Sequence, residues 1–236
     1  MTGGFKGGVD RAFCFARASP PPVPLVPLTP VSPPVLLSDR AALGLGTLIP
    51  LLGCGEEAAA LAFDGLASTS ADPVASHALA TIAAEERVHD RLLAQLTNRL
   101  PGAERRVGLM RAARRFHIQL GRGGATAHLG RIAAIDAAVC TVLGRLLRPG
   151  GALRADPAIA AIFVRIHKDE ARHVRVSRTL ALASMSRSEL NDIAAASRTA
   201  LAAILGLAGD SIEALGLDPD PLLAEVARLP DGLFAA

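Results

Sequence analysis

Residues 85–89 and 169–173 repeat one arrangement of acidic and histidine side chains. The first segment reads Glu-Glu-Arg-Val-His and the second Asp-Glu-Ala-Arg-His, so each is an acid followed by Glu-x-x-His. On an α-helix this spacing puts Glu and His on one face, roughly 60° apart and about 4.5 Å along the axis. Nine Glu and six His among 236 residues predict only about 0.2 such matches by chance. The metal ligands predicted from this repeat are Glu86, His89, Glu170 and His173.

Carboxylates in two other segments could complete such a site. Glu56 and Glu57 lie in one apolar run and Asp136 lies in another. An isolated ionised carboxylate is costly to bury, so a metal ion or a cationic partner is expected beside it. For Asp136 the alternative to a metal is a buried pair with Arg131 or Arg145. The order carboxylate, Glu-x-x-His, carboxylate, Glu-x-x-His supplies oxygen and imidazole donors that suit a pair of iron or manganese ions.

Helices are expected to position these side chains. From residue 38 onward the sequence is rich in Ala, Leu and Arg and lacks β-branched alternation, which predicts an all-α body. Four long helices joined by short connections predict an antiparallel four-helix bundle with extra short helices. The expected segments are 38–67 (broken near Pro50 and Gly55), 73–100, 103–120, 125–147, 157–183 and 187–206, followed by two short helical pieces.

Capping signals give the clearest expected helix starts. Asp72-Pro73 and Asp156-Pro157 each place an N-cap acid before a proline at the first helical position. Ser186 and Glu189 have the spacing of a capping box.

The first 37 residues differ from the rest. They contain glycines and then a proline run between residues 20 and 34, which predicts a disordered Pro-rich tail. The expected domains are therefore this tail, 1–37, and a helical bundle domain with C-terminal helices, 38–236.

The composition limits which cellular locations and which binding partners are expected. Three cysteines, an odd number, fit free thiols in a reducing compartment, so we expect a cytoplasmic protein. The uncharged stretches 18–38 and 41–55 contain several prolines or glycines, and neither resembles a membrane span of about 20 apolar residues. A net charge of +3, with no Trp or Tyr, argues against a nucleic-acid partner.

From Gly55 to Leu182 the sequence resembles the ferritin-like di-iron carboxylate superfamily. Gly55-Glu56 followed by Phe63 is similar to the first-helix motif of rubrerythrins and of ubiquinone-biosynthesis hydroxylases. Residues 169–173 are similar to the Asp-Glu-x-Arg-His motif of bacterial di-iron monooxygenases, the soluble methane monooxygenase hydroxylases. The resemblance implies that Glu56, rather than Glu57, is a metal ligand. It also implies that the metal is a pair of iron ions, with manganese as an alternative.

The same resemblance implies roles around the metal ligands. In that superfamily the acid before the Glu holds the histidine of the opposite motif, which implies that Asp169 supports His89 and that Glu85 supports His173. Asp136 stands where the superfamily normally has Glu. His167 lies three residues before Glu170, whereas arylamine N-oxygenases carry an extra histidine ligand four residues before it. His167 is therefore either a third histidine ligand or a histidine that does not bind metal and lies in the core or next to the ligands.

A run of arginines between residues 99 and 131 could bind an anion. This segment has eight arginines and one acid. Arginine recognises carboxylate and phosphate groups, although such a run is more often a solvated helix face. The candidate anion-binding residues are Arg105, Arg106, Arg111, Arg114 and Arg115.

These observations predict an oxidoreductase that uses a di-iron centre to activate dioxygen, a non-haem oxygenase or oxidase. The expected reaction is hydroxylation or N-oxygenation of a small apolar substrate, with a reductase as electron donor. Without Tyr or Trp the chain lacks the tyrosyl radical or the equivalent aromatic relay of a ribonucleotide-reductase-type subunit. One alternative is a ferritin-like protein that stores iron or removes peroxide, and another is a metal-free helical scaffold.

Overall fold

The computed structural model describes residues 34–101 and 106–234. Within these ranges the protein has eight α-helices, one short 3₁₀-helix and no β-strand, which confirms the predicted all-α class. The helices are α1 (Asp39–Thr69), α2 (Pro73–Thr97), α3 (Val107–Leu120), α4 (Ala125–Leu146), η1 (Ala152–Ala155), α5 (Pro157–Leu182), α6 (Arg187–Gly206), α7 (Gly209–Ala214) and α8 (Pro219–Ala227).

Local capping sets three of these helix starts, as predicted. The side chains of Asp72 and Asp156 accept hydrogen bonds from backbone N–H groups in the first turns of α2 and α5. Both helices carry proline at the first helical position, where its missing N–H leaves no hydrogen bond unmade. Ser186 and Glu189 form both hydrogen bonds of a capping box at the start of α6.

The predicted break near Pro50 and Gly55 is wrong, because α1 runs through both residues. A proline inside a helix removes one backbone hydrogen bond and costs about 3 kcal/mol. Core residues lie on both sides of the proline, including the fully buried Leu45 before it and Phe63 after it. Burial of both halves of α1 offsets the local cost.

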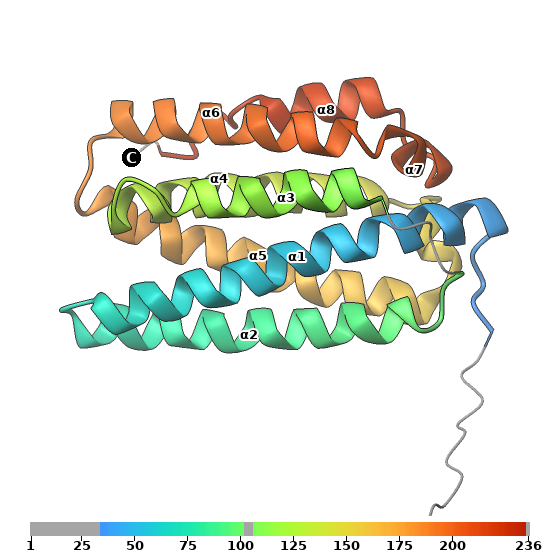
Figure 1. The fold of residues 1–236 in the computed structure, drawn as a ribbon, viewed down its shortest axis with the longest axis horizontal. Helices are drawn as coiled ribbons and strands as arrows, with labels where there is room; N and C mark the ends of the chain where they lie inside the picture. The colour runs from blue at the N-terminus through green and yellow to red at the C-terminus, as the bar shows by residue number, and fades with distance from the viewer. Residues whose placement is uncertain (1–33, 102–105, 235–236) are drawn as a thin grey trace, which may run out of the picture. The chain divides into compact units, whose positions relative to one another are not determined.

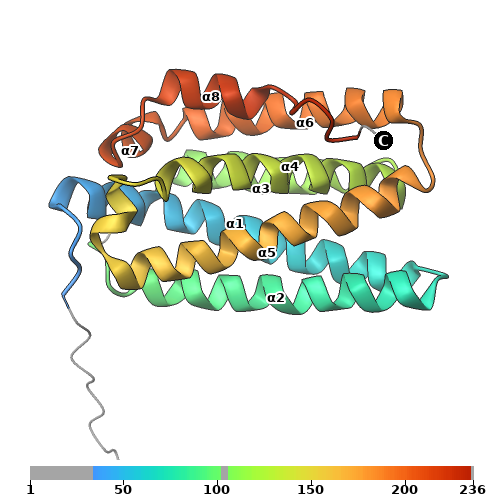
Figure 2. The same ribbon diagram turned by 180° about the vertical axis from the view of Figure 1, so that it is seen from behind.

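The helices form antiparallel pairs stacked in layers (Figures 1 and 2). The α1–α2 and α4–α5 pairs make the most extensive packing contacts, and α2 also packs on α5. Helix α3 lies against α1 and α6, while α6 and α8 cover α4. The pairs α1–α2 and α4–α5 therefore form a helical bundle, with α3 and the C-terminal helices added along one side.

Two separate apolar clusters hold the bundle together. One contains Leu45 and Ile49 of α1, and the other contains Phe63. On α2 the order is reversed, with Ile82 in the second cluster and Leu93 in the first. The middle turns of the paired helices, between these clusters, carry the buried acidic and histidine side chains described below.

The helical unit begins before the predicted domain boundary. Leu37 is buried in the first apolar cluster, and the N–H of Leu36 donates to Asp156 Oδ2 at 3.0 Å. Residues 34–37, which the sequence analysis assigned to the tail, therefore belong to the helical unit. The remainder of the predicted tail, residues 1–33, lies outside the described residues.

Helix α1 is the one described helix that is long and apolar enough to span a membrane by length and composition. Its continuity makes it longer than the interrupted stretch expected from the sequence. Its buried residues pack against α2, α3 and α7, and the core helix of a soluble protein meets the same criteria. The cytoplasmic location stays a prediction.

Candidate metal centre

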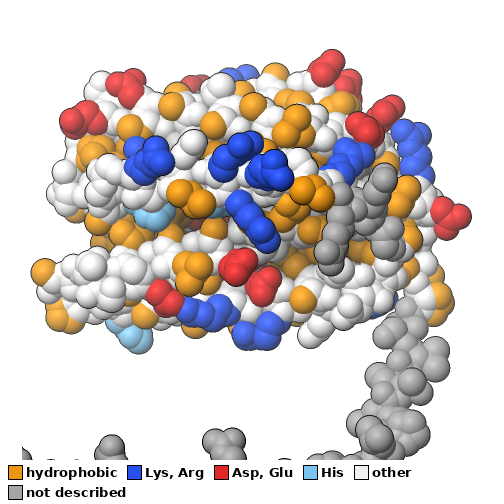
Figure 3. Space-filling view, in the orientation of Figure 1, with side chains coloured by type: hydrophobic (Ala, Val, Ile, Leu, Met, Phe, Trp, Pro, Cys, Tyr) orange, Lys and Arg blue, Asp and Glu red, His pale blue; other side chains and the backbone are white. Residues whose placement is uncertain are grey.

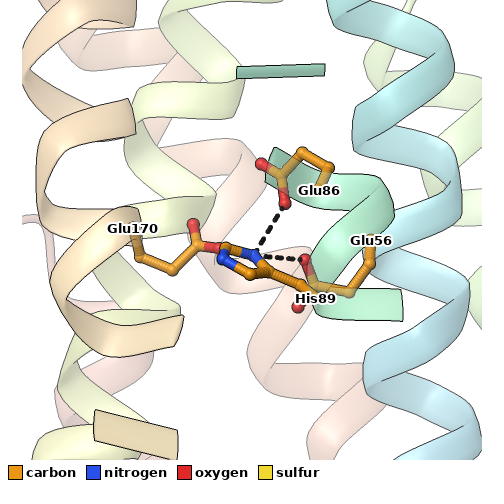
Figure 4. Close-up of side chains that lie close together, drawn as sticks. All are labelled: Glu56, Glu86, His89 and Glu170. Carbon is orange, nitrogen blue, oxygen red and sulfur yellow. Dashed lines mark hydrogen bonds and ion pairs between the residues drawn. The ribbon is translucent and has the colours of Figure 1, made fainter. Parts of the chain in front are cut away.

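Helices α1, α2 and α5 bring four of the predicted ligands together around one histidine nitrogen (Figure 4). His89 Nδ1 lies 3.2 Å from Glu56 Oε2 and 3.2 Å from Glu86 Oε2. Glu170 Oε1 approaches the same nitrogen to 3.5 Å. All four residues are buried, and one donor atom from each lies within 4.8 Å of the others, close enough to hold a metal ion.

A second group of donors adjoins the first. Asp136 on α4 joins Glu170 and His173 of α5, with donor atoms again within 4.8 Å of one another. Glu86 Oε1 lies 2.9 Å from His173 Nδ1, and Glu170 Oε2 lies 3.6 Å from it. Glu86 and Glu170 therefore each have one oxygen near His89 and the other near His173, an arrangement that allows both carboxylates to be shared between two metal positions.

The outer nitrogens of both histidines meet the acids that the resemblance implied. His89 Nε2 is 3.2 Å from Asp169 Oδ2, and His173 Nε2 is 3.1 Å from Glu85 Oε2. Arg172 pairs with Glu85 and lies 4.0 Å from Asp169, so one guanidinium faces both outer acids. Each acid can accept the Nε2–H of its histidine, which leaves Nδ1 facing the buried cluster.

The surrounding carboxylates favour protonated rings when no metal is bound. Burial alone would lower the pKa of His89, but Glu170, Glu56 and Glu86 outweigh burial and raise that pKa to about 12. In His173 burial is likewise outweighed by Glu170 and Glu86, which raise its pKa to about 11. A metal ion bound at Nδ1 must therefore displace a proton from the ring.

The carboxylates themselves divide into two kinds. Burial would raise the pKa of Glu86, but contacts with both histidines lower it to about 2, so this group stays ionised. Burial raises the pKa of Glu56 and of Asp136 well above the usual range. Without a metal, burial therefore favours the protonated form of these two side chains.

Asp136 lacks the arginine partner that was its alternative explanation. Its Oδ2 atom is buried and has no hydrogen-bond partner in the part of the chain that the structure describes. Arg131 instead donates to the carbonyl of Leu120 at 3.0 Å, and Arg145 forms a double hydrogen bond with Glu225. An unpartnered buried carboxylate oxygen, on a residue whose carboxylate adjoins Glu170 and His173, is a feature that a bound cation would explain.

Other predicted residues lie apart from this cluster. Glu57 is exposed beside the buried Glu56. The Nε2 atom of His167 lies near Gly144, and His167 is in neither group of metal donors.

The arginine candidates are spread over the surface. Lys and Arg side chains follow α3 across one face of the protein (Figure 3). Arg111, Arg114 and Arg115 are exposed there, whereas Arg106 is engaged with Asp210 at 3.1 Å. Arg105 lies outside the described residues.

A large apolar cavity reaches the cluster from the α3 side. Its volume is about 620 Å³, and Glu56, Glu86, Asp136 and Glu170 form part of its wall. Most of the remaining wall consists of apolar side chains from α1, α3, α4 and α6. The candidate metal centre is therefore open to an apolar space of the size that ligand pockets commonly have.

The cavity wall also contains two histidines that were not among the predicted site residues. His117 comes from α3 and His128 from α4, and both are half-buried. Burial lowers the pKa of His117 to about 4 and also lowers the pKa of His128, so both rings are neutral near pH 7. Neither histidine belongs to a spaced motif, and only the packing of α3 and α4 around the cavity reveals their positions.

No protein-family model, no curated protein and no solved structure matches this chain.

Proposed function

We propose that the protein is a ferritin-like di-iron carboxylate oxidoreductase that activates dioxygen and oxidises an apolar substrate. The observation that carries this proposal is the pair of buried Glu-x-x-His motifs whose two inward Nδ1 atoms share Glu86 and Glu170. Four carboxylates and two neutral imidazoles balance the charge of two divalent ions. This set of donors therefore suits two iron or manganese ions better than a single ion.

Each metal position would draw on both helix pairs. Glu56 and His89 would hold one ion and Asp136 and His173 the other, with Glu86 and Glu170 between them. When bound, the iron pair would supply the electron chemistry with dioxygen. The protein would orient both histidines through Asp169 and Glu85, keep the cluster buried and leave it open to the apolar cavity.

Metal analysis and oxygen uptake test the proposal. After anaerobic loading with ferrous iron and desalting, we expect about two irons per chain and consumption of dioxygen when air is admitted. Glu56→Ala should lower the iron content, whereas the matched variant Glu57→Ala, at an exposed position, should not. Absence of bound metal would contradict the proposal, and loading far beyond two irons per chain would favour iron storage.

A further inference from the structure

The cavity beside the candidate metal centre suits a largely apolar occupant. Its volume of about 620 Å³ would hold roughly 20 non-hydrogen atoms, at the volume of about 30 Å³ that one water molecule takes in the liquid. Ile135 and Val139 of α4 and Ile204 of α6 are among the apolar side chains that line it. Leu61 of α1 and Ile118 of α3 also line it and are 66% and 69% exposed, so the cavity reaches the surface between these two helices. A molecule that enters from solution would gain free energy mainly by burying apolar surface.

The exposed charges of the cavity wall offset each other. Among the described wall residues, Arg114 and Glu57 are the charged side chains that are exposed. Burial raises the pKa of the Cys54 thiol, Arg114 opposes this shift and Glu57 adds to it, so both charges lie close to Cys54. The other charged wall residues are four buried carboxylates, which the proposed function assigns to metal ions. An anionic ligand would therefore lose its hydration without meeting an uncompensated cation, which favours an uncharged ligand.

Two histidines supply uncharged hydrogen-bonding groups to the wall. Burial lowers the pKa of His117 and of His128, so each ring is neutral near pH 7 and carries one N–H donor and one acceptor nitrogen. His128 lies beside Gly121, at the turn between α3 and α4, and precedes Asp136 by eight residues, or roughly 12 Å of helix. His128 is therefore at the end of the cavity near this turn, away from Asp136.

His117 lies beside the turn of α1 that carries Glu56. A Cβ atom at Gly55 would be 3.8 Å from both Cε1 and Nε2 of His117, so this edge of the ring faces α1 one residue before Glu56. The ring of Phe116 lies 5.2 Å away, centroid to centroid, and among the described residues no group forms a hydrogen bond with the His117 ring. A ring nitrogen without a partner in an apolar cavity costs free energy. An occupant with a hydrogen-bonding group at this point is therefore favoured over one without it.

We propose that the cavity binds an apolar molecule that carries one uncharged hydroxyl group, and that His117 forms a hydrogen bond with this hydroxyl. The neutral ring can either donate a hydrogen bond to the hydroxyl oxygen or accept one from it. Because His117 lies next to the α1 turn that carries Glu56, this bond would fix which end of the molecule lies beside the metal centre. As a substrate class this rests on the proposed function, whereas binding itself requires neither iron nor turnover.

Three probes that share one ring system test the ligand class. Naphthalene has no hydrogen-bonding group, 2-naphthol carries a hydroxyl that is uncharged near pH 7, as in Tyr, and 2-naphthoate carries a negative charge. Fluorescence titration of the full-length protein suits them because the chain has no Trp or Tyr, and a chelator prevents binding of a probe to iron. 2-Naphthol should bind more tightly than 2-naphthoate. Tighter binding of 2-naphthoate, or no binding of any probe, would overturn the proposal.

The role of His117 is measured by the affinity for 2-naphthol relative to naphthalene. His117→Phe keeps a ring at this position and removes both nitrogens, so it should lower this ratio about 2- to 12-fold, the range for one net hydrogen bond. His77→Phe, at an exposed position on α2, and His128→Phe, at the far turn, are the matched controls and should keep the wild-type ratio. An unchanged ratio in His117→Phe, or an equal loss in His128→Phe, would overturn the proposal.

A second pair of variants tests whether the probes bind in this cavity. Ala58 is half-buried in the wall one turn after Gly55, and Ala58→Phe should weaken binding of naphthalene and 2-naphthol alike, about tenfold or more. Ala80→Phe, at an exposed position on α2 outside the wall, should not. If Ala58→Phe has lost its cooperative melting transition, Ala58→Leu serves instead. Wild-type affinities in the Ala58 variant would overturn the proposal.

The iron assays are read separately from the binding assays. Binding of 2-naphthol through His117 by a protein that does not consume dioxygen would leave this inference standing and remove the proposed function. Iron-dependent oxygen consumption without a contribution of His117 to binding would do the reverse.

Discussion

Replacing Asp136 with leucine should have opposite effects on the metal-free fold and on metal binding. Without metal, burial raises the pKa of Asp136 and favours its neutral form, and its Oδ2 atom has no hydrogen-bond partner among the described residues. A buried polar group left in this state costs about 1–3 kcal/mol. Leucine removes this cost, and its larger side chain can extend into the cavity that Asp136 already lines.

The expected gain is large enough for thermal denaturation to resolve. For a helical unit of this size, 1 kcal/mol shifts the melting temperature by about 2–4 °C. Metal-free Asp136→Leu should therefore melt roughly 2 to 12 °C above the metal-free wild type. Asp136→Asn resembles the protonated acid and should stay within about 0.5 kcal/mol of the wild type.

Metal loading should reverse this order of melting temperatures. Both variants lose a carboxylate from the group that contains Glu170 and His173, so both should bind less iron than the wild type and gain less stability from it. Both effects can be measured by circular-dichroism melts, with chelator and with anaerobic ferrous iron, together with metal analysis. Glu57→Gln is the surface control.

The alternative role for Asp136 predicts a different pattern. If the carboxylate were the partner of a buried arginine, its removal would leave an unpaired charge and destabilise the metal-free fold by about 3–5 kcal/mol. A lower melting temperature for metal-free Asp136→Leu would refute the reasoning. Unchanged iron content in both variants would refute it as well.

Further predictions concern the supports of the cluster, its protonation and helix packing. Asp169→Asn should weaken iron binding roughly 10- to 100-fold in competition with a chelator, while Asp64→Asn, in a surface ion pair, should leave it unchanged. Because the two cluster histidines have pKa values of about 12 and 11, iron binding should release protons near pH 7 and weaken as the pH falls, which calorimetry in buffers of different ionisation enthalpy would measure. In α1, Gly44→Ala should lower the free energy of unfolding by about 1–3 kcal/mol, because its Cβ would lie 2.8 Å from the carbonyl oxygen of Ser211. Gly65→Ala in the same helix meets nothing within 4 Å and should raise it by up to about 1 kcal/mol; equal effects in chemical denaturation would contradict this contrast.

Features encoded by local chemistry could be predicted from the sequence. Asp72, Asp156 and Ser186 begin helices because their side chains satisfy N–H groups a few residues away, a requirement that does not depend on the rest of the fold. The Glu-x-x-His spacing likewise fixes which side chains share a helix face. The resemblance to ferritin-like di-iron proteins implied contacts of His89 and His173 with the acid that precedes the motif on the opposite helix, and these contacts are present.

Features that depend on packing between distant segments could not be predicted in this way. The continuity of α1 through Pro50 depends on burial against α2 and α7, which outweighs a local rule. The cavity exists because α3 lies across the space between α1, α4 and α6, and neither His117 nor His128 has a sequence signal for facing it. Arg106 was grouped with an anion site, but its partner, Asp210, is distant in sequence.

The separation of the two apolar clusters explains how one bundle tolerates so many buried ionisable groups. Each paired helix is held by apolar contacts on both sides of its polar turns, so the backbone positions of the cluster do not depend on contacts within it. Burial of four carboxylates and two histidines costs free energy that these flanking contacts must offset. Metal ions would neutralise the cluster and add stability by binding only the folded chain. A bundle built in this way keeps its ligands preorganised without metal, unlike a small domain whose folding depends on the ion.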